Sequence, residues 1–579
     1  MKNKHLIKRI FKYLKPYILI LVLAFLSALV YVFATLYAPM LMGNLIDELD
    51  YLHDFGSLRN KFYTYLYLLI GCVIIGALFG YIMTYFLNKL TYLMIRDLRI
   101  DTFAKINRVP VSYIDSHSYG DLLSRIITDI DTVAEGLLQT FTEALTGIIT
   151  IIFTLVFMLR LNYKIGLLVV ALTPLSLIGA TFIAKMSFKT FKAQAEVKGR
   201  LTGFVNEMVE NQAVIKAYGR EDANTKTFDE IDEELYKYGI NAQFYSSLAN
   251  PITRFVNAII YLCVATFGAI DVVSGGLKVG MLSTFLSYAS SYTKPFNSIS
   301  SVATELQNSF ASLRRVFELL DAKELPDESN LKEIENIDGE IAFKDVFFSY
   351  KSDVSLIEKF SIDCKKGEQI AIVGPTGCGK TTLINLLMRF YDINSGDITV
   401  DSKSIYQIKR KSLRSHMGMV LQDTWLFKGT VKENIAYGKD NATNEEIIDA
   451  AKRAYAHEFI MQLPHGYDTI ISDSDGMSTG QKQLLCIARL MLRIPNVLIL
   501  DEATSNIDTR TEILISKAFK EMMAGRTTFI IAHRLSTIKN ADKIIVMKDG
   551  HIMEIGRHEE LLAKNGFYTS IYNSQFQVK

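Results

Sequence analysis

The first candidate for chemistry is a glycine-rich run that ends in a lysine and two threonines, residues 374–382. It follows an apolar segment, residues 369–373, and leads into a helical pattern, residues 382–390. The spacing is GxxxxGK[ST] in a strand–loop–helix context, where backbone amides and a helix N-terminus cradle phosphate. Lys380 is expected to bridge the β- and γ-phosphates of a nucleotide, and Thr381 to hold Mg²⁺. The expected nucleotide-binding residues of this loop are Gly374, Pro375, Thr376, Gly377, Cys378, Gly379, Lys380, Thr381 and Thr382.

A second candidate is a pair of carboxylates, Asp501 and Glu502, at the end of the apolar run 496–500. Neighbouring residues on a strand face opposite ways, so each carboxylate can have its own task. Asp501 is expected to bind Mg²⁺ through water, and Glu502 to orient or deprotonate the attacking water. A solvated acidic turn is the alternative, and the phosphate loop favours the catalytic interpretation. His533 follows another apolar run, where a sheet presents its ligand-binding loops.

The elements that would position these residues are short β-branched runs, alternating with helical patterns from Ile341 onward. This texture predicts an α/β domain with a buried parallel sheet over residues 341–579. The polar stretch before it, residues 322–340, is expected to be a linker. The runs expected to be strands include residues 369–373, 496–500, 527–531 and 543–547.

The N-terminal part, residues 1–321, has the composition of a membrane domain. The chain has 579 residues, 49% of them hydrophobic, which is too long for one domain and too apolar for an ordinary soluble protein. Residues 16–46 and 62–88 carry no charged side chain. Six helical spans are expected, near residues 17–42, 62–88, 137–159, 165–186, 250–273 and 279–301.

The distribution of Lys and Arg indicates an orientation for these spans. The N-terminal arm and the segments 89–135 and 187–249 are rich in Lys and Arg, whereas the 43–61 connection carries Asp47, Glu48, Asp50 and Asp54 instead. The positive-inside rule then predicts a multi-pass protein of the plasma membrane with both termini in the cytosol. The first apolar run is too long for a signal peptide and lacks a small-residue cleavage site.

The segments 89–135 and 187–249 are expected to be long helical hairpins below the membrane, since they lack the Gly, Pro and Ser clusters that mark loops. Their turns are expected near residues 112–120 and 216–220, each with a glycine where a helix should stop. The net charge of +2 predicts no nucleic-acid or other polyanionic partner. The 5 cysteines form no CxxC pair and are expected to be free thiols.

The C-terminal half resembles the nucleotide-binding domain of ATP-binding cassette (ABC) transporters. The resemblance implies that Tyr350 stacks on adenine, that Gln422 senses Mg²⁺ and the attacking water, and that His533 contacts the γ-phosphate. It also implies that Asp508 communicates with the site of a partner subunit. The matching positions are Tyr350, the phosphate loop, Gln422, Met477–Gln481, Asp501-Glu502, Ser505–Asp508 and His533.

The membrane half resembles multidrug-exporter half-transporters. The resemblance implies a second half-transporter as partner, ATP and Mg²⁺ as cofactors, and hairpin turns that dock on nucleotide-binding domains, the second turn on that of the partner. The expected function is ATP-driven export of a small amphipathic substrate, such as a drug, lipid or peptide, with membrane lipid around it. An ATP-gated channel or sensor is the alternative. Trp425, the only tryptophan, lies in the segment that the family uses to meet the turns, unless it is buried in the core.

The chain departs from the family at its signature, which usually reads Leu-Ser-Gly-Gly-Gln. Here Ser478, Thr479, Gly480 and Gln481 are expected to face the γ-phosphate held by the partner's phosphate loop. Thr479 replaces a glycine whose backbone can take unusual dihedrals, and Asp473 and Asp475 lie just upstream. We therefore expect one impaired site in a heterodimer, with this chain as the catalytically intact subunit. A homodimer with two active sites is the alternative.

Ionisable residues also interrupt the apolar spans. Glu143, Arg254 and Lys294 are expected near the inner membrane boundary, either as snorkelling residues or as the lining of an inward-facing cavity. Asp271 lies near the outer end of its span and is a candidate for an external gate.

Overall fold

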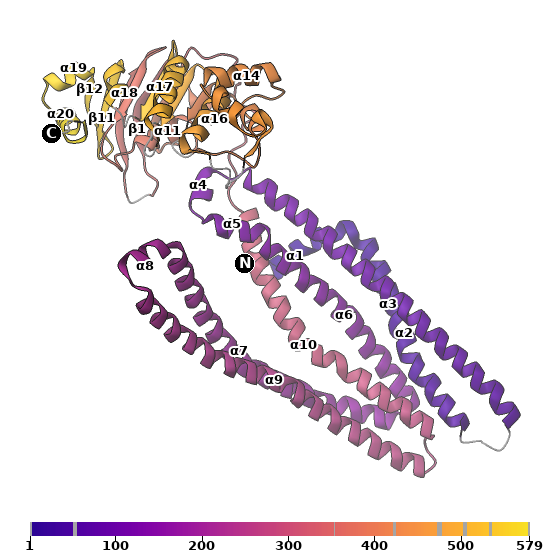
Figure 1. Ribbon diagram of the computed structural model, residues 1–579. Helices are drawn as coiled ribbons and strands as arrows, with labels where there is room; N and C mark the ends of the chain where they lie inside the picture. The colour runs from indigo at the N-terminus through magenta and orange to yellow at the C-terminus, as the bar shows by residue number, and fades with distance from the viewer. Residues whose placement is uncertain are drawn as a thin grey trace. The chain divides into compact units, whose positions relative to one another are not determined.

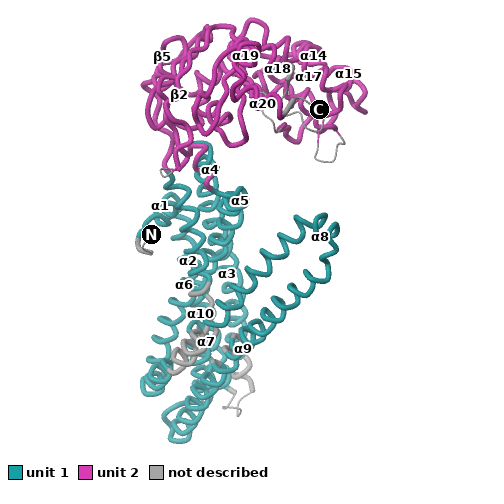
Figure 2. The backbone as a smooth tube through the Cα atoms, turned by 90° about the vertical axis from the view of Figure 1, so that its left-hand side faces the viewer, with its two compact units in different colours: residues 1–108, 117–322 teal, residues 109–116, 323–579 magenta. Residues whose placement is uncertain are grey.

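The structure is a computed structural model that describes residues 3–49, 55–351, 354–420, 424–471, 477–501, 507–531 and 535–576 (Figure 1). It divides into two compact units (Figure 2). The first unit comprises residues 1–108 and 117–322, and the second comprises residues 109–116 and 323–579. Residues 109–116 thus belong to the second unit, although they lie inside the N-terminal half of the chain.

The first unit is helical, as its apolar composition predicts. Four helical stretches in its described part are long and apolar enough to cross a membrane, and a fifth, Tyr163–Pro174, is shorter. The four are His5–Glu48, Lys61–Ile106, Tyr119–Leu161 and Arg254–Val273. The other two expected spans, 165–186 and 279–301, lie within long helices. The helices of residues 1–322 are α1 (Asn3–Leu14), η1 (Lys15–Tyr17), α2 (Ile18–Leu49), α3 (Phe55–Ile106), α4 (Val111–Asp115), α5 (Tyr119–Ile126), α6 (Thr128–Leu161), α7 (Tyr163–Glu210), α8 (Gln212–Tyr218), α9 (Glu221–Val273) and α10 (Val279–Leu320), of which α4 belongs to the second unit.

Small residues let α2 and α10 approach closely. A Cβ on Gly43 would lie 2.4 Å from the carbonyl oxygen of Gly280, and a Cβ on Gly280 would lie 1.9 Å from that of Gly43. Farther along the same pair, the buried Tyr288 hydroxyl donates to the Leu36 carbonyl over 2.8 Å. Close backbone contact of this kind replaces the hydrophobic driving force that helices lack within lipid.

Asp271, the candidate for an external gate, joins two helix ends. Its Oδ2 accepts a hydrogen bond of 2.8 Å from the side-chain amide of Asn162. The Asn162 Oδ1 in turn accepts from the amides of Lys164 and Ile165 and so caps α7. These bonds explain Asp271 as a connection between the α6–α7 turn and the end of α9.

The two hairpin turns contain short helices rather than simple loops. Gly219 has a left-handed φ of 58° and ends α8, so its lack of a side chain is needed there. Gly120 does not end a helix, which corrects the expectation for the first turn. It lies in the first turn of α5, where the hydroxyl of Ser118 accepts a hydrogen bond from the Asp121 amide.

Proline is unevenly distributed among the long helices. Pro39 lies inside α2, Pro174 inside α7, Pro251 inside α9 and Pro295 inside α10. Neither α3 nor α6 contains a proline. Each internal proline removes one backbone hydrogen bond and favours a kink at its position.

The second unit has a six-stranded sheet in the order β12-β11-β3-β10-β9-β6, parallel from β11 to β6. Every residue of β9 and β10 is buried, as expected for strands covered on both faces. A second sheet has the order β2-β1-β4-β5, and β7 pairs with β8. The strands are β1 (Ile341–Phe348), β2 (Ile357–Cys364), β3 (Gln369–Val373), β4 (Ser395–Val400), β5 (Lys403–Ser404), β6 (Met417–Val420), β7 (Gly429–Thr430), β8 (Ile470–Ile471), β9 (Val497–Asp501), β10 (Thr527–Ile531), β11 (Lys543–Lys548) and β12 (His551–Gly556).

Helices pack on both faces of the six-stranded sheet, and separate apolar clusters fill the two sides. One cluster includes Leu484 of α16 and Phe519 of α17, and the other includes Leu386 of α11 and Phe343 of β1. The helices are α11 (Lys380–Leu387), η2 (Ile405–Gln407), α12 (Arg410–Ser415), α13 (Val431–Ala436), α14 (Asn444–Arg453), α15 (His457–Gln462), η3 (Gly466–Asp468), α16 (Thr479–Met491), α17 (Thr509–Met523), α18 (Leu535–Asn540), α19 (His558–Ala563) and α20 (Phe567–Phe576).

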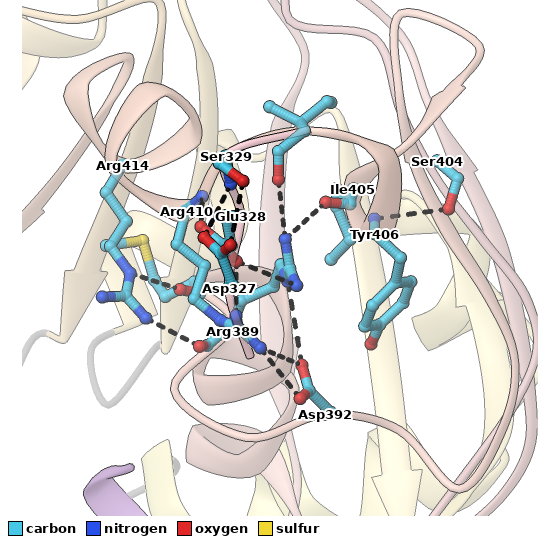
Figure 3. Close-up of polar contacts among 12 residues, drawn as sticks. Asp327, Glu328, Ser329, Arg389, Asp392, Ser404, Ile405, Tyr406, Arg410 and Arg414 are labelled. Carbon is cyan, nitrogen blue, oxygen red and sulfur yellow. Dashed lines mark hydrogen bonds and ion pairs between the residues drawn. The ribbon is translucent and has the colours of Figure 1, made fainter. Parts of the chain in front are cut away.

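An arginine cluster binds the polar linker to the rest of the second unit (Figure 3). Glu328 accepts a hydrogen bond of 2.7 Å from the Arg410 amide and forms an ion pair with the Arg410 guanidinium. It also lies 3.4 Å from Nη2 of Arg389. Asp392 accepts two bonds from Arg410, of 2.9 and 3.0 Å. The side chains of Arg389 and Arg410 are 5% and 6% exposed, so these carboxylates compensate buried charge.

Removing Glu328 should therefore destabilise the second unit. We expect Glu328→Ala to lower the free energy of unfolding by about 3–5 kcal/mol, because two buried guanidinium groups lose a shared carboxylate. Thermal unfolding of the full-length chain in detergent measures the effect. Glu333→Ala is the matched control: Glu333 pairs with Lys409 over 2.8 Å but is 70% exposed, so its loss should change little. Equal shifts in the two variants would contradict this role of Glu328.

Candidate nucleotide-binding site

The phosphate loop joins β3 to α11, in the strand–loop–helix order that its sequence predicts. Gly377 and Gly379 have φ values of 85° and 101°, which a residue with a side chain adopts only under strain. A Cβ on Gly374 would lie 2.3 Å from the Met547 carbonyl oxygen. The three glycines thus let the loop curl tightly before α11, whose first amides lack partners within the helix. This arrangement fits the phosphates of a nucleotide.

Lys380 lies over the loop that it follows. Its ammonium donates to the carbonyl oxygens of Gly374 and Pro375 over 2.8 and 2.9 Å. It is also 3.9 Å from the sulfur of Cys378. The positive charge is therefore held beside the left-handed glycines, where a phosphate would need it.

The side chains of the loop divide into two groups. Pro375, Thr376 and Thr381 are exposed, so the Thr381 hydroxyl is accessible to a metal bound with nucleotide. Cys378 and Thr382 are buried and can contribute to nucleotide binding only through the backbone. Burial raises the pKa of the Cys378 thiol, although the nearby Lys380 ammonium opposes this effect.

Tyr350, the expected adenine platform, is 49% exposed and lies beside α11. Its hydroxyl is 3.3 Å from the Thr382 hydroxyl. Its ring meets the ring of Tyr391 edge to face, with centroids 4.9 Å apart. The ring is thus supported from behind while half of its surface remains free to stack.

Sequence reasoning missed Tyr391 and its partner in α4. The Tyr391 hydroxyl donates a hydrogen bond to the Asp115 carboxylate, across 276 residues of sequence. Burial, and then the Asp115 carboxylate, raise the pKa of Tyr391, so the hydroxyl keeps its proton and acts as the donor. The only sequence signal is the position of Tyr391 shortly after α11, which by itself names no partner.

Asp501 ends β9 and is 8% exposed. Because β3, β10 and β9 are adjacent and parallel, Asp501 and the phosphate loop share the carboxyl edge of the sheet. Glu502, Gln422 and His533 lie outside the described residues. Each follows a strand of the same parallel sheet, since β9 ends at Asp501, β6 at Val420 and β10 at Ile531. Their chain positions are therefore compatible with one site at this edge.

The signature segment begins α16. Ser478 caps the helix: its hydroxyl accepts from the Gln481 amide over 3.2 Å, and its own amide donates to the Gln481 side chain over 2.9 Å. Gly480 is needed for packing, because a Cβ there would lie 2.5 Å from a methyl of Thr511. Thr479 is exposed and is the first residue of α16, so its backbone is helical. The difference from glycine lies in its exposed side chain.

Asp508 caps the next helix, α17. Its Oδ1 accepts from the Thr511 amide over 2.9 Å, and this bond lowers the pKa of the carboxyl. The carboxylate therefore stays ionised at the N-terminus of α17.

Trp425 is 56% exposed, which excludes the alternative of a buried core residue. Together with Tyr437 and Arg489 it lines a cleft of about 250 Å³. The Arg489 guanidinium lies 5.6 Å from the Trp425 ring and 5.2 Å from the Tyr437 ring. We call this surface the Trp425 cleft. Its exposed aromatic rings offer contact area for a protein segment.

Known families match both units. Residues 17–296 match the ABC transporter transmembrane region, and residues 357–505 match the ABC transporter family. The chain is 42% identical over 472 residues to the fatty acid ABC transporter ATP-binding/permease protein of Mycobacterium bovis, covering 81% of this chain and 75% of that protein. It is 34% identical over 582 residues to the ATP-dependent lipid A-core flippase of Desulfotalea psychrophila, covering 99% of this chain and 100% of that protein.

A third relative is a Bacillus subtilis protein with a provisional multidrug-export name. It is 34% identical over 587 residues, which cover 98% of this chain and 99% of the relative. The matched regions include both the membrane helices and the phosphate loop. This chain therefore belongs to the ABC transporter family, as an exporter half-transporter in which a multi-pass membrane region is fused to an ATPase coupled to transport.

Proposed function

We propose that the chain exports an amphipathic lipid or lipid-like drug across the plasma membrane, as the catalytically intact half of a heterodimer with both termini in the cytosol. The observation that carries the proposal is the complete phosphate loop fused to apolar helices, with Lys380 held beside left-handed glycines. ATP binding would join two nucleotide-binding domains, and hydrolysis would separate them. ATPase activity coupled to vectorial transport in vesicles tests this, and nucleotide-dependent conductance without transport would favour an ATP-gated channel.

The chemistry is divided among residues at the carboxyl edge of the sheet. Lys380 binds the β- and γ-phosphates, while Thr381 and Asp501 hold Mg²⁺, which neutralises phosphate charge. Glu502 positions or deprotonates the attacking water, with Gln422 and His533 beside the γ-phosphate. In support of these roles, the Thr381 side chain is exposed, and Asp501 ends a buried strand at the same edge of the sheet as the loop, with β10 between β9 and β3.

Residues of the membrane helices support the proposal of an amphipathic substrate. Gly147 of α6 faces Pro295 of α10, since a Cβ on Gly147 would lie 3.3 Å from the Pro295 side chain. Glu143 is one helical turn from Gly147, and the exposed Lys294 adjoins Pro295. We propose that these two residues, with the exposed Arg254, line the polar part of an inward-facing cavity. Two relatives carry names that refer to fatty acid and to lipid A-core.

The proposal of a heterodimer depends on Thr479. The signature of one subunit completes the site that contains the phosphate loop of the other. The Thr479 side chain projects from the exposed N-terminus of α16, where the usual glycine would leave the helix amides open to phosphate. A partner with the usual signature would complete the site built on Lys380, and Thr479 would impair the other site.

The Trp425 cleft gives the partner's second hairpin turn a place to dock. Within this chain that turn is α8, where Val214 and Tyr218 are 54% and 78% exposed. Exposed apolar side chains at a helical turn and an aromatic cleft are complementary in chemistry. We propose that the α8 counterpart of the partner subunit occupies the cleft and receives its motion.

Lys380→Ala should weaken ATP binding about 10- to 100-fold, because the phosphates lose a charge-assisted hydrogen bond. Turnover should fall to background. Nucleotide binding and phosphate release from the reconstituted complex measure both effects. Lys366→Ala is the control, since Lys366 is 65% exposed and pairs with Asp338 at the surface. ATPase activity of the Lys380 variant at the wild-type rate would refute the site.

Glu502→Gln and Thr479→Gly should have unequal effects if the chain works in a heterodimer. Glu502→Gln should slow hydrolysis by a factor on the order of 10²–10⁴ with ATP binding retained, because general-base catalysis is lost. Thr479→Gly should change turnover modestly or restore the impaired site. The ATPase rate of each purified variant complex measures this. A stable homodimer of this chain alone with strong cargo-stimulated activity would instead show that Thr479 is a harmless variant.

Trp425 fluorescence should report occupation of the Trp425 cleft. Trp425 is the only tryptophan in this chain, so its emission has one source if the partner's tryptophans are replaced. We expect the emission to change on addition of MgATP, since ATP-driven closure alters the contacts of the exposed ring, and to stay constant in Lys380→Ala. A spectrum indifferent to nucleotide in the wild type would exclude the cleft from the moving interface.

A further inference from the structure

The segment Arg389–Asp392, which follows α11 after Met388, is called the post-helix segment here. It lies where three parts of the second unit meet: the phosphate-loop helix, the linker and α4, which Figure 2 colours with this unit. α11 ends at Leu387, and Arg389 then takes a left-handed φ of 50° that reverses the chain. Amides of Arg389 and Phe390 bond back to the carbonyls of Leu386 and Asn385, so the segment is fixed to α11.

Residues outside the post-helix segment form hydrogen bonds with its two charged ends, Arg389 and Asp392. The Arg389 guanidinium donates to the carbonyl oxygens of Ile405 and Ile408, both over 2.8 Å. Asp392 accepts two bonds from Arg410, which also holds Glu328 of the linker (Figure 3). A left-handed arginine costs conformational energy, and these bonds offset that cost. The backbone on both sides of Tyr391 is consequently anchored.

Tyr391, inside the post-helix segment, contacts the expected adenine platform with its ring. It meets Tyr350 at 4.9 Å with an interplanar angle of 89°, and it meets Phe348 at 5.9 Å and 71°. Phe348 and Tyr350 also pack edge to face at 4.8 Å. The three rings form a cluster in which Phe348 is buried and Tyr350 is half exposed. A shift of the Tyr391 ring therefore changes the contacts that orient Tyr350.

The hydroxyl of Tyr391 points away from this cluster to the Asp115 carboxylate at the end of α4. α4 belongs to the first hairpin turn, between α3 and α5. One side chain thus joins the hairpin turn, through its hydroxyl, to the adenine platform, through its ring. This path therefore reaches the expected platform for the base rather than the phosphate loop.

We propose that Tyr391 is a positioning residue through which the first hairpin turn sets the recognition of the nucleobase. This rests on the proposed role of Tyr350 as adenine platform. Displacement of α4 shifts the Tyr391 ring, and the edge-to-face contact passes that shift to Tyr350. By thermodynamic reciprocity, a base stacked on Tyr350 also favours one position of α4.

The test measures discrimination between bases rather than activity alone. KM and kcat for ATP and for UTP are determined on the full-length chain, in its dimer and in lipid nanodiscs, with changes in this chain only. Tyr391→Ala should lower the ratio of KM(UTP) to KM(ATP) about 3- to 10-fold, which is the value of an aromatic pair. The kcat at saturating ATP should stay within about twofold.

Two milder variants keep the aromatic ring or leave Tyr391 intact. Tyr391→Phe retains the ring, and Asp115→Ala changes an exposed carboxylate, so both should fold. Each should lower the base discrimination in the same direction, and the double variant should be no worse than either single variant, because both remove one hydrogen bond. Ser112→Ala, at another exposed position of α4, should leave the ratio unchanged.

Two results would overturn the proposal. One is an equal rise of KM for ATP and UTP in Tyr391→Ala, which indicates a general effect on the site. The other is unchanged discrimination in both Tyr391→Phe and Asp115→Ala. Tyr350→Ala separates this failure from failure of the proposed platform: if it leaves the ratio unchanged, adenine does not stack on Tyr350. Absence of any hydrolysis by the wild type would contradict the transporter function itself.

Discussion

The burial of parallel strands on both faces is the constraint on which the nucleotide-binding unit depends. Every side chain of β9 and β10 is removed from solvent, and no residue of these strands can contact a soluble ligand from a face. Chemistry is then confined to the carboxyl edge, where each strand gives way to a loop. Lys380 and Asp501 meet this constraint in different ways, one after a tight glycine loop and the other as the last residue of its strand.

Local patterns predict most of this unit because their causes are local. The runs 369–373 and 527–531 correspond to β3 and β10 residue for residue, since strands covered on both faces are rich in apolar and β-branched residues. The run 496–500 was one residue out of register with β9. The helix expected over 382–390 instead spans Lys380–Leu387, because a left-handed Arg389 reverses the chain. Sequence alone gives no reason for arginine in that conformation.

The features that sequence could not predict depend on contacts between distant residues. Asp115 and Tyr391 carry no spacing that relates them, and Glu328 looks like an ordinary linker residue until Arg389 and Arg410 surround it. Thr479 differs in that the resemblance to a family drew attention to it, and the structure then defines what the substitution changes. The family's glycine can take unusual dihedrals, whereas here the threonine lies in the first turn of a helix, so the difference is confined to its side chain. The roles of Glu502, Gln422 and His533 stay predictions drawn from chain position and resemblance.

The distribution of proline gives the two hairpins different mechanics. The first hairpin has α3 and α6 as its arms, and α3 runs for 52 residues, about 78 Å, without a proline. The second has α7 and α9, each with one internal proline: Pro174 lies within the expected span 165–186, and Pro251 lies where the expected span 250–273 begins. An uninterrupted helix resists bending, whereas one that lacks a backbone hydrogen bond yields at that point. The first hairpin should therefore act as a stiff lever, and the second as a jointed arm that can swing while its outer part stays still.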